Sequence, residues 1–486
     1  MTTNAEAVAT AARERRFDAE LAAVLGADLA RFEERGDSAN VQKPWLAAAL
    51  VLLGVAVTVL TAIAAAPDRT PLQGPAIYEP PLLTRIGVPT AGHLALLPSD
   101  ARSVAMFCHE ANRDFAPFAR LHEIVAVDVN GPGLEVEWAL DCLVPFASLP
   151  KLEVLAIPLQ PAMTPAHLAV LAKSTSLRSL KLYLRRTLTV DDVRVLAALP
   201  RLERLSLCEG TLDAVTVRSL SDLPKLSTLE LNAVVTDEAA LLQLRSLHLL
   251  RALRFEMMGA TPIAAPDAAG GIGAGLTPSV AAALRGLPVL ESLELQTCEV
   301  SVRAIEELPT TLRSFALTRS PDTAADVYVA MQRLVRLQRL AVDGPWSSTT
   351  AEVQRVEGER TVMSAKSTVV ENNAVQPSQA KLLQALPLVQ LDYTGTLSSE
   401  LRAALATTPS LREVRLHRAT LDDVRAVAAV PNLERLVLFQ SAKDAGDLEC
   451  LKAARTLKRL ELQYSNVKEV DAERVLPGVT IVVSPN

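Results

Sequence analysis

Few residues of this chain have the types and spacing that catalysis requires. The glycines between residues 270 and 275 suggest a phosphate-binding loop, but no Lys-Ser or Lys-Thr pair follows them and no strand is evident before them. Two His-Glu pairs begin an HExxH zinc motif, yet the second histidine is missing from both HEANR at His109 and HEIVA at His122. No GxSxG, EF-hand or kinase signature occurs.

Cysteine chemistry is equally weakly signalled. No CxxC motif is present, so the sequence indicates neither a zinc ribbon nor a dithiol redox site. A nucleophilic Cys208 or Cys298 with His248 or His417 is conceivable, but both cysteines follow predicted strands at positions that the repeat dictates, so we interpret them as structural. The five cysteines are Cys108, Cys142, Cys208, Cys298 and Cys450.

Two of these cysteines fall in one short segment. Cys108 and Cys142 lie in residues 100–148, where they predict either a disulfide, if the domain is extracytoplasmic, or two buried thiols. A metal site that adds His109 and His122 lacks any ligand-pair spacing. We therefore expect no metal and no cofactor.

An internal repeat determines which elements must position any functional residue. From Leu149 the motif LPxLxxLxL recurs, as in LPKLEVLAI, LPRLERLSL from Leu199 and LPVLESLEL from Leu287. Most steps between copies are 22 to 25 residues long, which is the period of a solenoid. The first Leu of each core is Leu152, Leu177, Leu202, Leu226, Leu250, Leu290, Leu312, Leu337, Leu388, Leu411, Leu433 and Leu457.

Each repeat predicts one strand and one helix. The last two leucines of LxxLxL alternate with polar residues at the period of a strand with one buried face. The rest is helical: Val193 and Leu196 share a face, and Thr189 with Asp192 resembles a capping box. Comparable start signals are Thr164 before Pro165, Thr236 before Asp237 and Thr277 before Pro278. Stacked copies would form a parallel concave sheet with convex helices.

These residues resemble the leucine-rich-repeat family, in particular its cysteine-containing and bacterial members. The resemblance covers about Leu149 to Val483 and implies a right-handed α/β solenoid that binds proteins, peptides, lipids or glycans on its concave face. One feature departs from the family: eight positions after the first Leu, its usual Asn or Cys is matched by Cys298, whereas the other repeats carry different residues there. Those are Gln160, Arg185, Gly210, Val234, Ser320, Ala419, Ser441 and Ser465.

The predicted strands align a candidate binding patch near the C-terminus. Because outward residues alternate with buried Leu, neighbouring repeats place side chains in columns about 4.8 Å apart. Exposed aromatic residues beside Arg often carry interface energy, and only 3% of the chain is aromatic. Ordinary solenoid surface near a C-terminal cap is the alternative. The columns are His417, Phe439 and Gln463; Arg418, Gln440 and Tyr464; and Arg435 with Arg459.

Two insertions interrupt the period. The first, at 257–275, contains GATPIAAPDAAGGIGAG, which is flexible by composition. The second, at 343–380, contains VQRVEGERTVMS, which predicts a hairpin that turns at Glu357, Gly358 and Glu359. Insertions in repeat proteins often lie at binding surfaces, although plain tolerated loops are the alternative.

An apolar stretch predicts a transmembrane helix at 46–66. These 21 residues carry no charge, and their length spans a hydrocarbon core of about 30 Å. A cleaved signal peptide is the alternative, although such a peptide rarely has a segment as long as residues 1–43 before its apolar stretch. Three basic residues lie within about 20 residues before the stretch and two after it, which favours a cytoplasmic N-terminus and an extracytoplasmic repeat domain.

The flanks of this stretch differ in composition. Residues 1–43 form a short segment in which Phe17, Leu21, Leu25 and Phe32 recur at helical spacing. That stripe predicts an amphipathic helix within residues 5–34 that self-associates or docks on a partner, with a marginal, fluctuating helix as the alternative. Residues 67–99 are rich in proline and predict a stalk, and residues 100–148 would cap the solenoid that occupies 149–486.

Composition narrows the class of function. The net charge of −6 and the dispersal of Lys and Arg among Asp and Glu predict no nucleic-acid partner. We expect a membrane-anchored recognition or scaffolding module, not an enzyme, that binds a protein or peptide on its concave face. The alternative is an envelope-associated enzyme whose chemistry lies in 100–148 or 257–275, with the solenoid holding the substrate.

Overall fold

A computed structural model describes residues 86–88, 94, 97–107, 115–130, 141–256, 275–318, 324–343, 347–354, 362–369, 376–442 and 444–484. The chain divides into two units, Met1–Ala66 and Pro67–Asn486, and every described residue belongs to the second. The predicted amphipathic helix, the apolar stretch at 46–66, most of the stalk, most of the first insertion and Cys108 lie outside the described residues. Within the described part, no helix has both the length and the apolar content to cross a bilayer.

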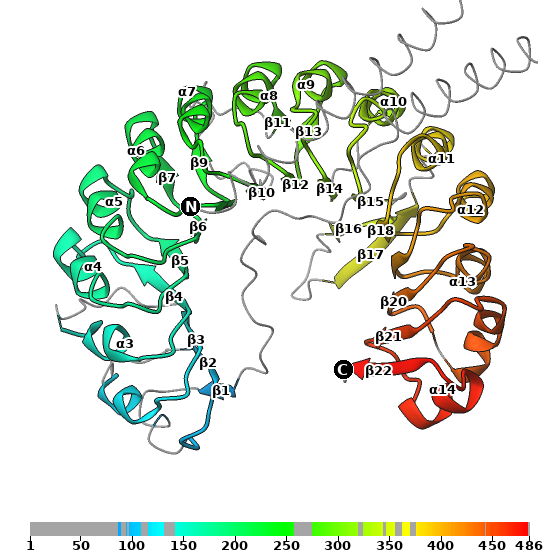
Figure 1. The fold of residues 1–486 in the computed structure, drawn as a ribbon, viewed down its shortest axis with the longest axis horizontal. Coiled ribbons are helices and arrows are strands. Elements are labelled where there is room, and N and C mark those ends of the chain that lie inside the picture. Colours follow the sequence, from blue (N-terminus) through cyan, green and yellow to red (C-terminus); the bar gives the residue numbers. More distant parts are fainter. Residues whose placement is uncertain are drawn as a thin grey trace, which may run out of the picture. The chain divides into compact units, whose positions relative to one another are not determined.

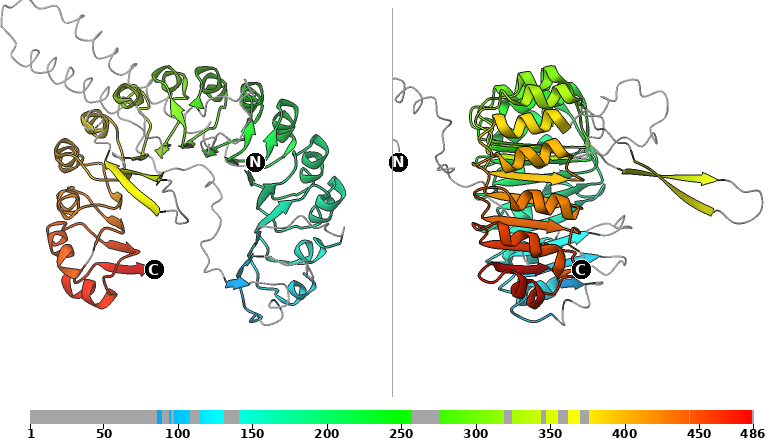
Figure 2. Two further views of the ribbon diagram at one scale, coloured as in Figure 1. Left: turned by 180° about the vertical axis from the view of Figure 1, so that it is seen from behind. Right: turned by 90° about the vertical axis from the view of Figure 1, so that its right-hand side faces the viewer.

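A parallel sheet of sixteen strands forms the concave face of the second unit, and the helices cover its convex face (Figure 1). Figure 2 shows the same curved row of strands from behind and edge-on. The strands are β1 (Ile86–Val88), β2 (Ser103–Phe107), β3 (Ala126–Asn130), β4 (Val154–Leu159), β5 (Ser179–Leu184), β6 (Arg204–Cys208), β8 (Thr228–Asn232), β10 (Ala252–Glu256), β12 (Ser292–Gln296), β14 (Ser314–Thr318), β15 (Arg339–Asp343), β18 (Gln390–Thr394), β19 (Glu413–His417), β20 (Arg435–Phe439), β21 (Arg459–Gln463) and β22 (Thr480–Ser484).

Each of the twelve predicted repeats contributes one strand of this sheet. The register brings like positions together, as in Leu205 beside Leu229 and Leu207 beside Leu231, and these leucines are buried. The residues between them face the concave side, as period-two alternation requires. The predicted α/β solenoid is therefore confirmed. The sheet also begins earlier than the motif, because β2 and β3 lie in the predicted cap and β1 in the predicted stalk.

The convex helices are short, and most of the α-helices begin at a Thr, Ser or Asp N-cap. The α-helices are α3 (Val144–Ser148), α4 (Pro165–Leu171), α5 (Val190–Leu196), α6 (Ala214–Ser219), α7 (Glu238–Leu242), α8 (Pro278–Arg285), α9 (Val302–Glu307), α10 (Ala325–Met331), α11 (Gln376–Ala385), α12 (Ser399–Ala406), α13 (Leu421–Ala428) and α14 (Glu469–Val475). The 3-10 helices are η2 (Ala116–Arg120), η3 (Leu220–Asp222), η4 (Gln243–Ser246) and η5 (Ala445–Ala453).

The predicted helix starts are confirmed at three of four sites. Thr164 and Thr277 precede α4 and α8 as N-caps, and Thr189 with Asp192 forms the expected capping box of α5. Thr236 is not a cap, because it ends the short strand β9 (Val235–Thr236). The N-cap of α7 is Asp237, whose carboxylate accepts a 2.7 Å hydrogen bond from the backbone N–H of Ala240.

A left-handed residue follows many of the strands at the same repeat position. Its N–H donates to the last carbonyl of the next strand, as from Arg418 to Phe439 (2.9 Å) and from Gln440 to Gln463 (3.0 Å). The chain then turns away from the sheet toward the helix. The non-glycine residues with positive φ are Glu209, Ala233, Thr297, Arg418, Gln440 and Tyr464.

The core is one continuous cluster of mostly Leu between sheet and helices. At its N-terminal end three rings replace leucines: Phe115, Phe118 and Phe146 are buried, with centroids 5.1 Å apart from Phe146 to each of the other two. The segment predicted as a cap therefore continues the core as well as the sheet.

The second insertion contains the predicted hairpin. Strands β16 (Ser347–Gln354) and β17 (Val362–Val369) pair antiparallel, with Gln354 opposite Val362. The predicted turn residues lie outside the described residues. The base of the insertion is fixed by Gln379 of α11, whose Nε2 donates a 3.1 Å hydrogen bond to the carbonyl of Asp343. Other short strands are β7 (Thr211–Leu212), which pairs with β9, and β11 (Gly275–Leu276), which pairs with β13 (Glu299–Val300).

Candidate binding groove on the concave sheet face

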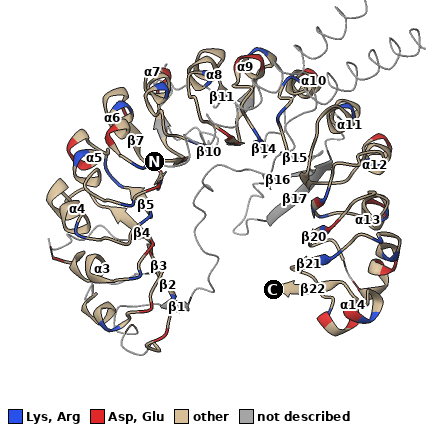
Figure 3. Cartoon of the chain, in the orientation of Figure 1, with Lys and Arg blue, Asp and Glu red and all other residues tan. Residues whose placement is uncertain are grey.

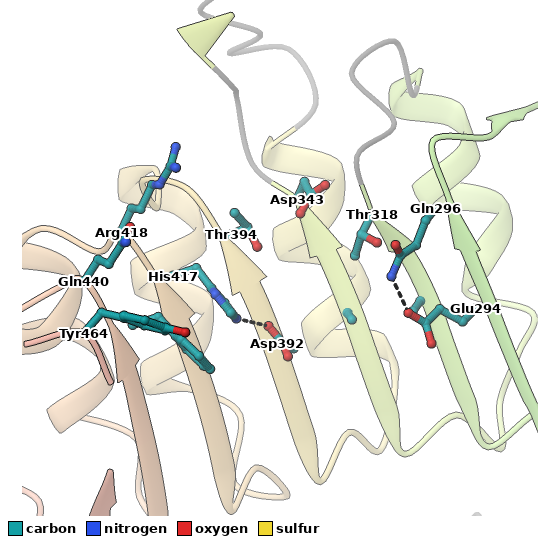
Figure 4. A pocket seen from close by; sticks show the side chains of 13 residues that line it. Glu294, Gln296, Thr318, Asp343, Asp392, Thr394, His417, Arg418, Gln440 and Tyr464 are labelled. Carbon is teal, nitrogen blue, oxygen red and sulfur yellow. Dashed lines mark hydrogen bonds and ion pairs between the residues drawn. The ribbon is translucent and has the colours of Figure 1, made fainter. Parts of the chain in front are cut away.

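A groove of about 420 Å³ crosses the concave face from β12 to β21 (Figure 4). It lies toward the carboxyl ends of the strands, where outward side chains of successive repeats stand side by side. Its lining residues are Glu294, Gln296, Ala316, Thr318, Ala341, Asp343, Asp392, Thr394, His417, Arg418, Phe439, Gln440 and Tyr464.

Two alanines produce the hollow part of the groove. Ala316 on β14 and Ala341 on β15 are register partners, and each places only a methyl group on the concave face. On either side of them the register places a carboxylate: Glu294 pairs with Ala316, and Asp392 pairs with Ala341. Three strand steps of about 4.8 Å separate those carboxylates by about 14 Å. Four outward positions thus form a row across the sheet, with a shallow apolar floor between two carboxylates. We call this the acidic row; its residues are Glu294, Ala316, Ala341 and Asp392.

The carboxylates of this row are oriented by neighbours on the same face. Glu294 accepts a 2.5 Å hydrogen bond from Nε2 of Gln296, and its Oε1 is 3.6 Å from Nε of Arg254. Asp392 Oδ1 is 3.1 Å from Nε2 of His417. Asp343 adds a third carboxylate to the lining. This end of the groove is therefore lined by three carboxylates.

Aromatic side chains form the other end. The rings of His417 and Phe439 stack with centroids 4.0 Å apart and an interplanar angle of 9°. Tyr464 from the next repeat is 58% exposed, although most large apolar side chains among the described residues are buried. Its φ of 51° is a left-handed value that tyrosine adopts at a cost of about 1 kcal/mol or more.

The structure brings together most of the predicted patch. His417, Arg418, Phe439, Gln440 and Tyr464 all line the groove. The predicted column is present in the register, which pairs His417 with Phe439 and Phe439 with Gln463, but Gln463 does not belong to the lining. Arg418, Gln440 and Tyr464 follow the strands instead of lying in them. A binding role for these residues remains a prediction.

The two other predicted residues, Arg435 and Arg459, lie at the opposite end of the strands and line no part of this groove. They hold Glu461 between them, at 2.7 Å and 2.6 Å. Burial raises the pKa of Glu461, but hydrogen bonds from both arginines lower it further, so the net pKa is below the usual range. Their position indicates an ion-pair ladder across the sheet.

Sequence reasoning missed the acidic half of the groove. Glu294, Asp343 and Asp392 come from three repeats, one of them beyond the second insertion, and none is unusual alone. The sequence did contain one signal for a groove, namely alanine at the same outward position of two neighbouring repeats. Ala316 and Ala341 are this pair, and their small side chains leave space above the sheet. Asp343 is also the residue at which the second insertion leaves the sheet, so that insertion begins at the groove, and a binding role for it remains a prediction.

The cysteines lie in structural surroundings. Cys208 is buried at the end of β6 beside Ser206, and the Cys298 thiol donates to the carbonyl of Gln296 (3.3 Å). Cys142 is partly buried against the core, and because Cys108 lies outside the described residues, the disulfide remains a prediction. Among the described residues, no three His, Cys, Asp or Glu side chains gather as a metal site.

Charges of both signs are interspersed over strands and helices alike (Figure 3). Many form pairs across neighbouring repeats, such as Arg178 with Glu203 (2.9 Å) and Arg251 with Glu291 (2.8 Å). This matches the dispersed charge seen in the sequence. The same interspersion surrounds the groove, where Arg254 is the register partner of Glu294 and Arg415 that of Asp392.

No family model and no curated protein matches this chain. Several solved structures are similar to it. The leucine-rich repeat-containing protein LegL7 from Legionella pneumophila has 13% identity over 52% of this chain and 90% of that chain (TM-score 0.36). A leucine-rich-repeat protein from Leptospira interrogans, LIC12759, has 15% identity over 82% and 99% (TM-score 0.32). TLR13 in complex with ssRNA13 has 16% identity over 78% and 62% (TM-score 0.38).

The architecture is established by the molecule's own features: a repeat of 22 to 25 residues, leucines in register across a sixteen-stranded parallel sheet, and a helix or 3-10 turn between strands. The described part of the chain is an α/β solenoid whose repeats carry leucines at a fixed spacing.

Proposed function

We propose that this chain is a recognition module that binds a protein or peptide partner in the groove between β12 and β21. The observation that carries the proposal is the aromatic end of the groove. A stacked His417–Phe439 pair and an exposed Tyr464 stand together on a concave face, in a chain that is only 3% aromatic. Such side chains commonly dominate binding energy at protein interfaces.

The acidic row supports a protein or peptide over a nucleic acid as the occupant. Phosphate groups would lie beside Glu294, Asp343 and Asp392, where like charges repel them. The enzymatic alternative requires a tight cluster of His, Asp, Glu or Cys from 100–148 and 257–275. Residues 108–114, 131–140 and 257–274 lie outside the described residues, and the groove offers no observation that favours this alternative.

Site-directed photo-crosslinking tests the proposal. A photo-reactive amino acid replaces exposed Gln440 in the groove, and a matched variant carries it at Val215, which is exposed on convex helix α6. We expect a crosslinked partner, identified by mass spectrometry, from Gln440 and none from Val215. Equal labelling at both positions, or none at Gln440, would contradict the proposal.

Removal of the rings measures their share of the affinity. Phe439→Ala with Tyr464→Ala is expected to weaken capture of the crosslinked partner by more than about 2 kcal/mol, because aromatic anchors at interfaces carry energies of that size. Thermal unfolding should change little. If the double variant binds normally, or if it unfolds, the rings are structural.

We further propose that residues 46–66 anchor the module in a membrane with the N-terminus in the cytoplasm. The support is the uncharged length of the stretch and the three basic residues that precede it. N-terminal sequencing of the mature protein should recover residues upstream of this stretch. A mature chain that begins near Pro67 would show cleavage instead. Protection of residues 67–486 from protease in sealed vesicles tests the orientation.

The apolar stripe within residues 5–34 is proposed to mediate self-association or docking across the membrane. Leu21→Asp with Leu25→Asp would place charge in the stripe and should abolish crosslinking through this segment. Unchanged crosslinking would reject the role. Asp18→Asn, outside the stripe, serves as the control.

A further inference from the structure

We propose that the occupant of the groove is an extended peptide segment that is basic in one half and aromatic in the other. This deepens the proposed function by naming the chemistry of the partner, and it rests on that function. The two halves of the occupant correspond to the two halves of the groove: the acidic row on β12 to β18 and the rings on β19 to β21 (Figure 4).

The acidic half fits a long cationic side chain. Ala316 and Ala341 leave space for its methylene stem, and Glu294 and Asp392 stand at the ends of that floor. Lys and Arg side chains commonly lie with an apolar stem on a surface and a charged head beside carboxylates. A neutral side chain at this place would gain no attraction from Glu294 and Asp392, and an acidic one would be repelled by them.

The positive groups nearby leave that preference intact. The lining contains three carboxylates and one guanidinium, that of Arg418, whose side chain extends away from the floor in Figure 4. Arg254 approaches Glu294 only to 3.6 Å, and its own outward neighbour Glu256 is 3.7 Å away. His417 faces Asp392 at 3.1 Å, and Arg415, the register partner of Asp392 on β19, donates to Glu413 at 2.8 Å. The floor between Glu294 and Asp392 therefore retains an unfavourable environment for an anion.

The aromatic half fits a ring of the ligand. His417 and Phe439 already stack in parallel, and Tyr464 lies on the next repeat with most of its surface exposed. A tryptophan or tyrosine placed there would bury apolar area and form offset or edge contacts with these rings. The left-handed backbone at Gln440 and Tyr464 holds both side chains at the rim.

The spacing of strands sets the spacing of the ligand residues. Three strand steps, about 14 Å, separate Ala341 on β15 from Phe439 on β20. An extended peptide advances about 3.3 Å per residue, so a basic residue and an aromatic residue should be about four positions apart. Six steps from β12 to β21 correspond to about 29 Å, which accommodates about nine residues.

Fluorescein-labelled nonapeptides test this assignment on the full chain. The probe GRRGGSWGS carries Arg and Trp four positions apart, GEEGGSWGS reverses the charge, and GRRWGGSGS moves the Trp next to Arg. By fluorescence anisotropy we expect the first to bind at least tenfold more tightly than either other peptide. Added salt should weaken its binding.

Two charge variants assign the cation site. Glu294→Gln with Asp392→Asn keeps the shapes and removes two carboxylates, so binding of GRRGGSWGS should fall at least tenfold and lose most of its salt dependence. Glu434→Gln is the matched control, because Glu434 pairs with Lys458 outside the groove and its loss should leave peptide binding unchanged. Glu294→Gln alone should give an intermediate loss and leaves the His417–Asp392 contact in place.

The outcomes separate this inference from the proposed function. If GEEGGSWGS binds as tightly as GRRGGSWGS, or if the double variant retains binding, the basic occupant is wrong, whereas crosslinking from Gln440 still upholds the groove as a partner site. If Gln440 yields no crosslink, the proposed function itself fails. An unfolding midpoint of the double variant that matches the unmodified chain confirms that any loss of binding arises in the groove.

Discussion

The two halves of the concave face share one backbone register but use their outward side chains differently. On β5 to β8 these side chains contact one another: Lys181 Nζ lies 4.7 Å from the centre of the Tyr183 ring, and Asn232 Nδ2 donates to the Cys208 thiol at 3.4 Å. On β14 and β15 the equivalent middle positions are Ala316 and Ala341, which leave a groove.

This difference indicates that the size of the outward side chains determines whether the concave surface of a repeat is filled by the protein itself or left open as a groove. Leucines at the inward positions are nearly interchangeable between repeats, so every repeat folds alike. Large polar side chains on neighbouring outward positions satisfy each other, as Arg204 and Glu230 do, whereas small ones leave space for another molecule. Substitutions of outward residues on β5 to β8 are therefore expected to change mainly stability, and those on β14 and β15 to change mainly binding.

The largest effect is expected at Asp192, in the N-terminal half. Its fully buried carboxylate accepts hydrogen bonds from Arg186 (2.6 and 2.8 Å) and from the N–H of Thr189 (2.9 Å). Asp192→Ala should lower the free energy of unfolding in urea by about 3 kcal/mol or more, because Arg186 would remain largely buried without its partner. Crosslinking from Gln440 should persist.

A neighbouring exposed residue provides the control. Asp191→Ala removes a surface ion pair with Arg194 and should change stability by about 0.5 kcal/mol or less. Loss of groove binding in a stably folded Asp192→Ala variant would show that the two halves are coupled and would break the comparison.

Alanine substitutions at two glycines, one in each half, are expected to differ in their loss of stability because the backbone lies close to a neighbour at only one of them. Gly210 has φ of 74°, and a Cβ added there would lie 2.5 Å from Cβ of Leu184. Gly478 has φ of 88° with nothing within 4 Å. Gly210→Ala should therefore destabilise by about 2 to 3 kcal/mol and Gly478→Ala by about 1 kcal/mol. Equal losses in urea unfolding would mean that backbone strain, and not the contact with Leu184, dominates.

Enlarging one outward residue in each half should have a smaller effect on stability, but the two variants should differ in which property changes, stability or binding. Ser206 is buried among Cys208 and Asn232, so Ser206→Leu should overpack this face and cost about 1 to 3 kcal/mol of stability. Ala341→Leu fills the open floor and should change stability by about 0.5 kcal/mol or less while it blocks crosslinking from Gln440. The reverse pattern would assign the functional surface to the N-terminal half.

Acid should produce the smallest effect. The pKa of Glu461 is lowered in the folded state, so its ion pairs stabilise the fold above the unfolded pKa of about 4.3 and this contribution is lost as pH falls through the lower, folded value. Glu461→Gln should thus reduce stability by about 1 kcal/mol at pH 7, and the difference from the unmodified chain should shrink below pH 4. A constant difference across this range would exclude the ionised pair as its source.

Much of the fold could be predicted because inward leucines recur at a fixed spacing. The strands β2 and β3 were missed because Val104, Met106, Val127 and Val129 alternate without that motif, and only the register with β4 reveals them as part of the sheet. The assignment of Thr236 as a cap failed because adjacent Thr and Asp both suit the position and geometry selects the Asp.

The candidate site was predictable only where residue type is informative. Phe439 and Tyr464 stand out in a chain poor in rings, and period-two alternation places Phe439 outward. The alanine floor gave no such signal, since Ala316 and Ala341 matter for the atoms they lack. Similarly, Ser441 and Ser465 replace the expected Asn or Cys with hydroxyl hydrogen bonds, from Ala419 N–H to Ser441 (2.9 Å) and from Ser465 to the carbonyl of Ala442 (2.9 Å).

The hydrogen bond from Gln379 to the carbonyl of Asp343 makes the second insertion a site where the chain can be redesigned. Buried Gln379 ties the carbonyl of Asp343 to α11, and β15 pairs directly with β18 across the insertion. Continuity of the sheet therefore does not depend on a covalent connection through the hairpin. Loop-closure entropy grows slowly with length, so the segment between Asp343 and Gln376 can be exchanged for a linker of another length, or opened to create new termini in a circular permutant, at little cost to the solenoid.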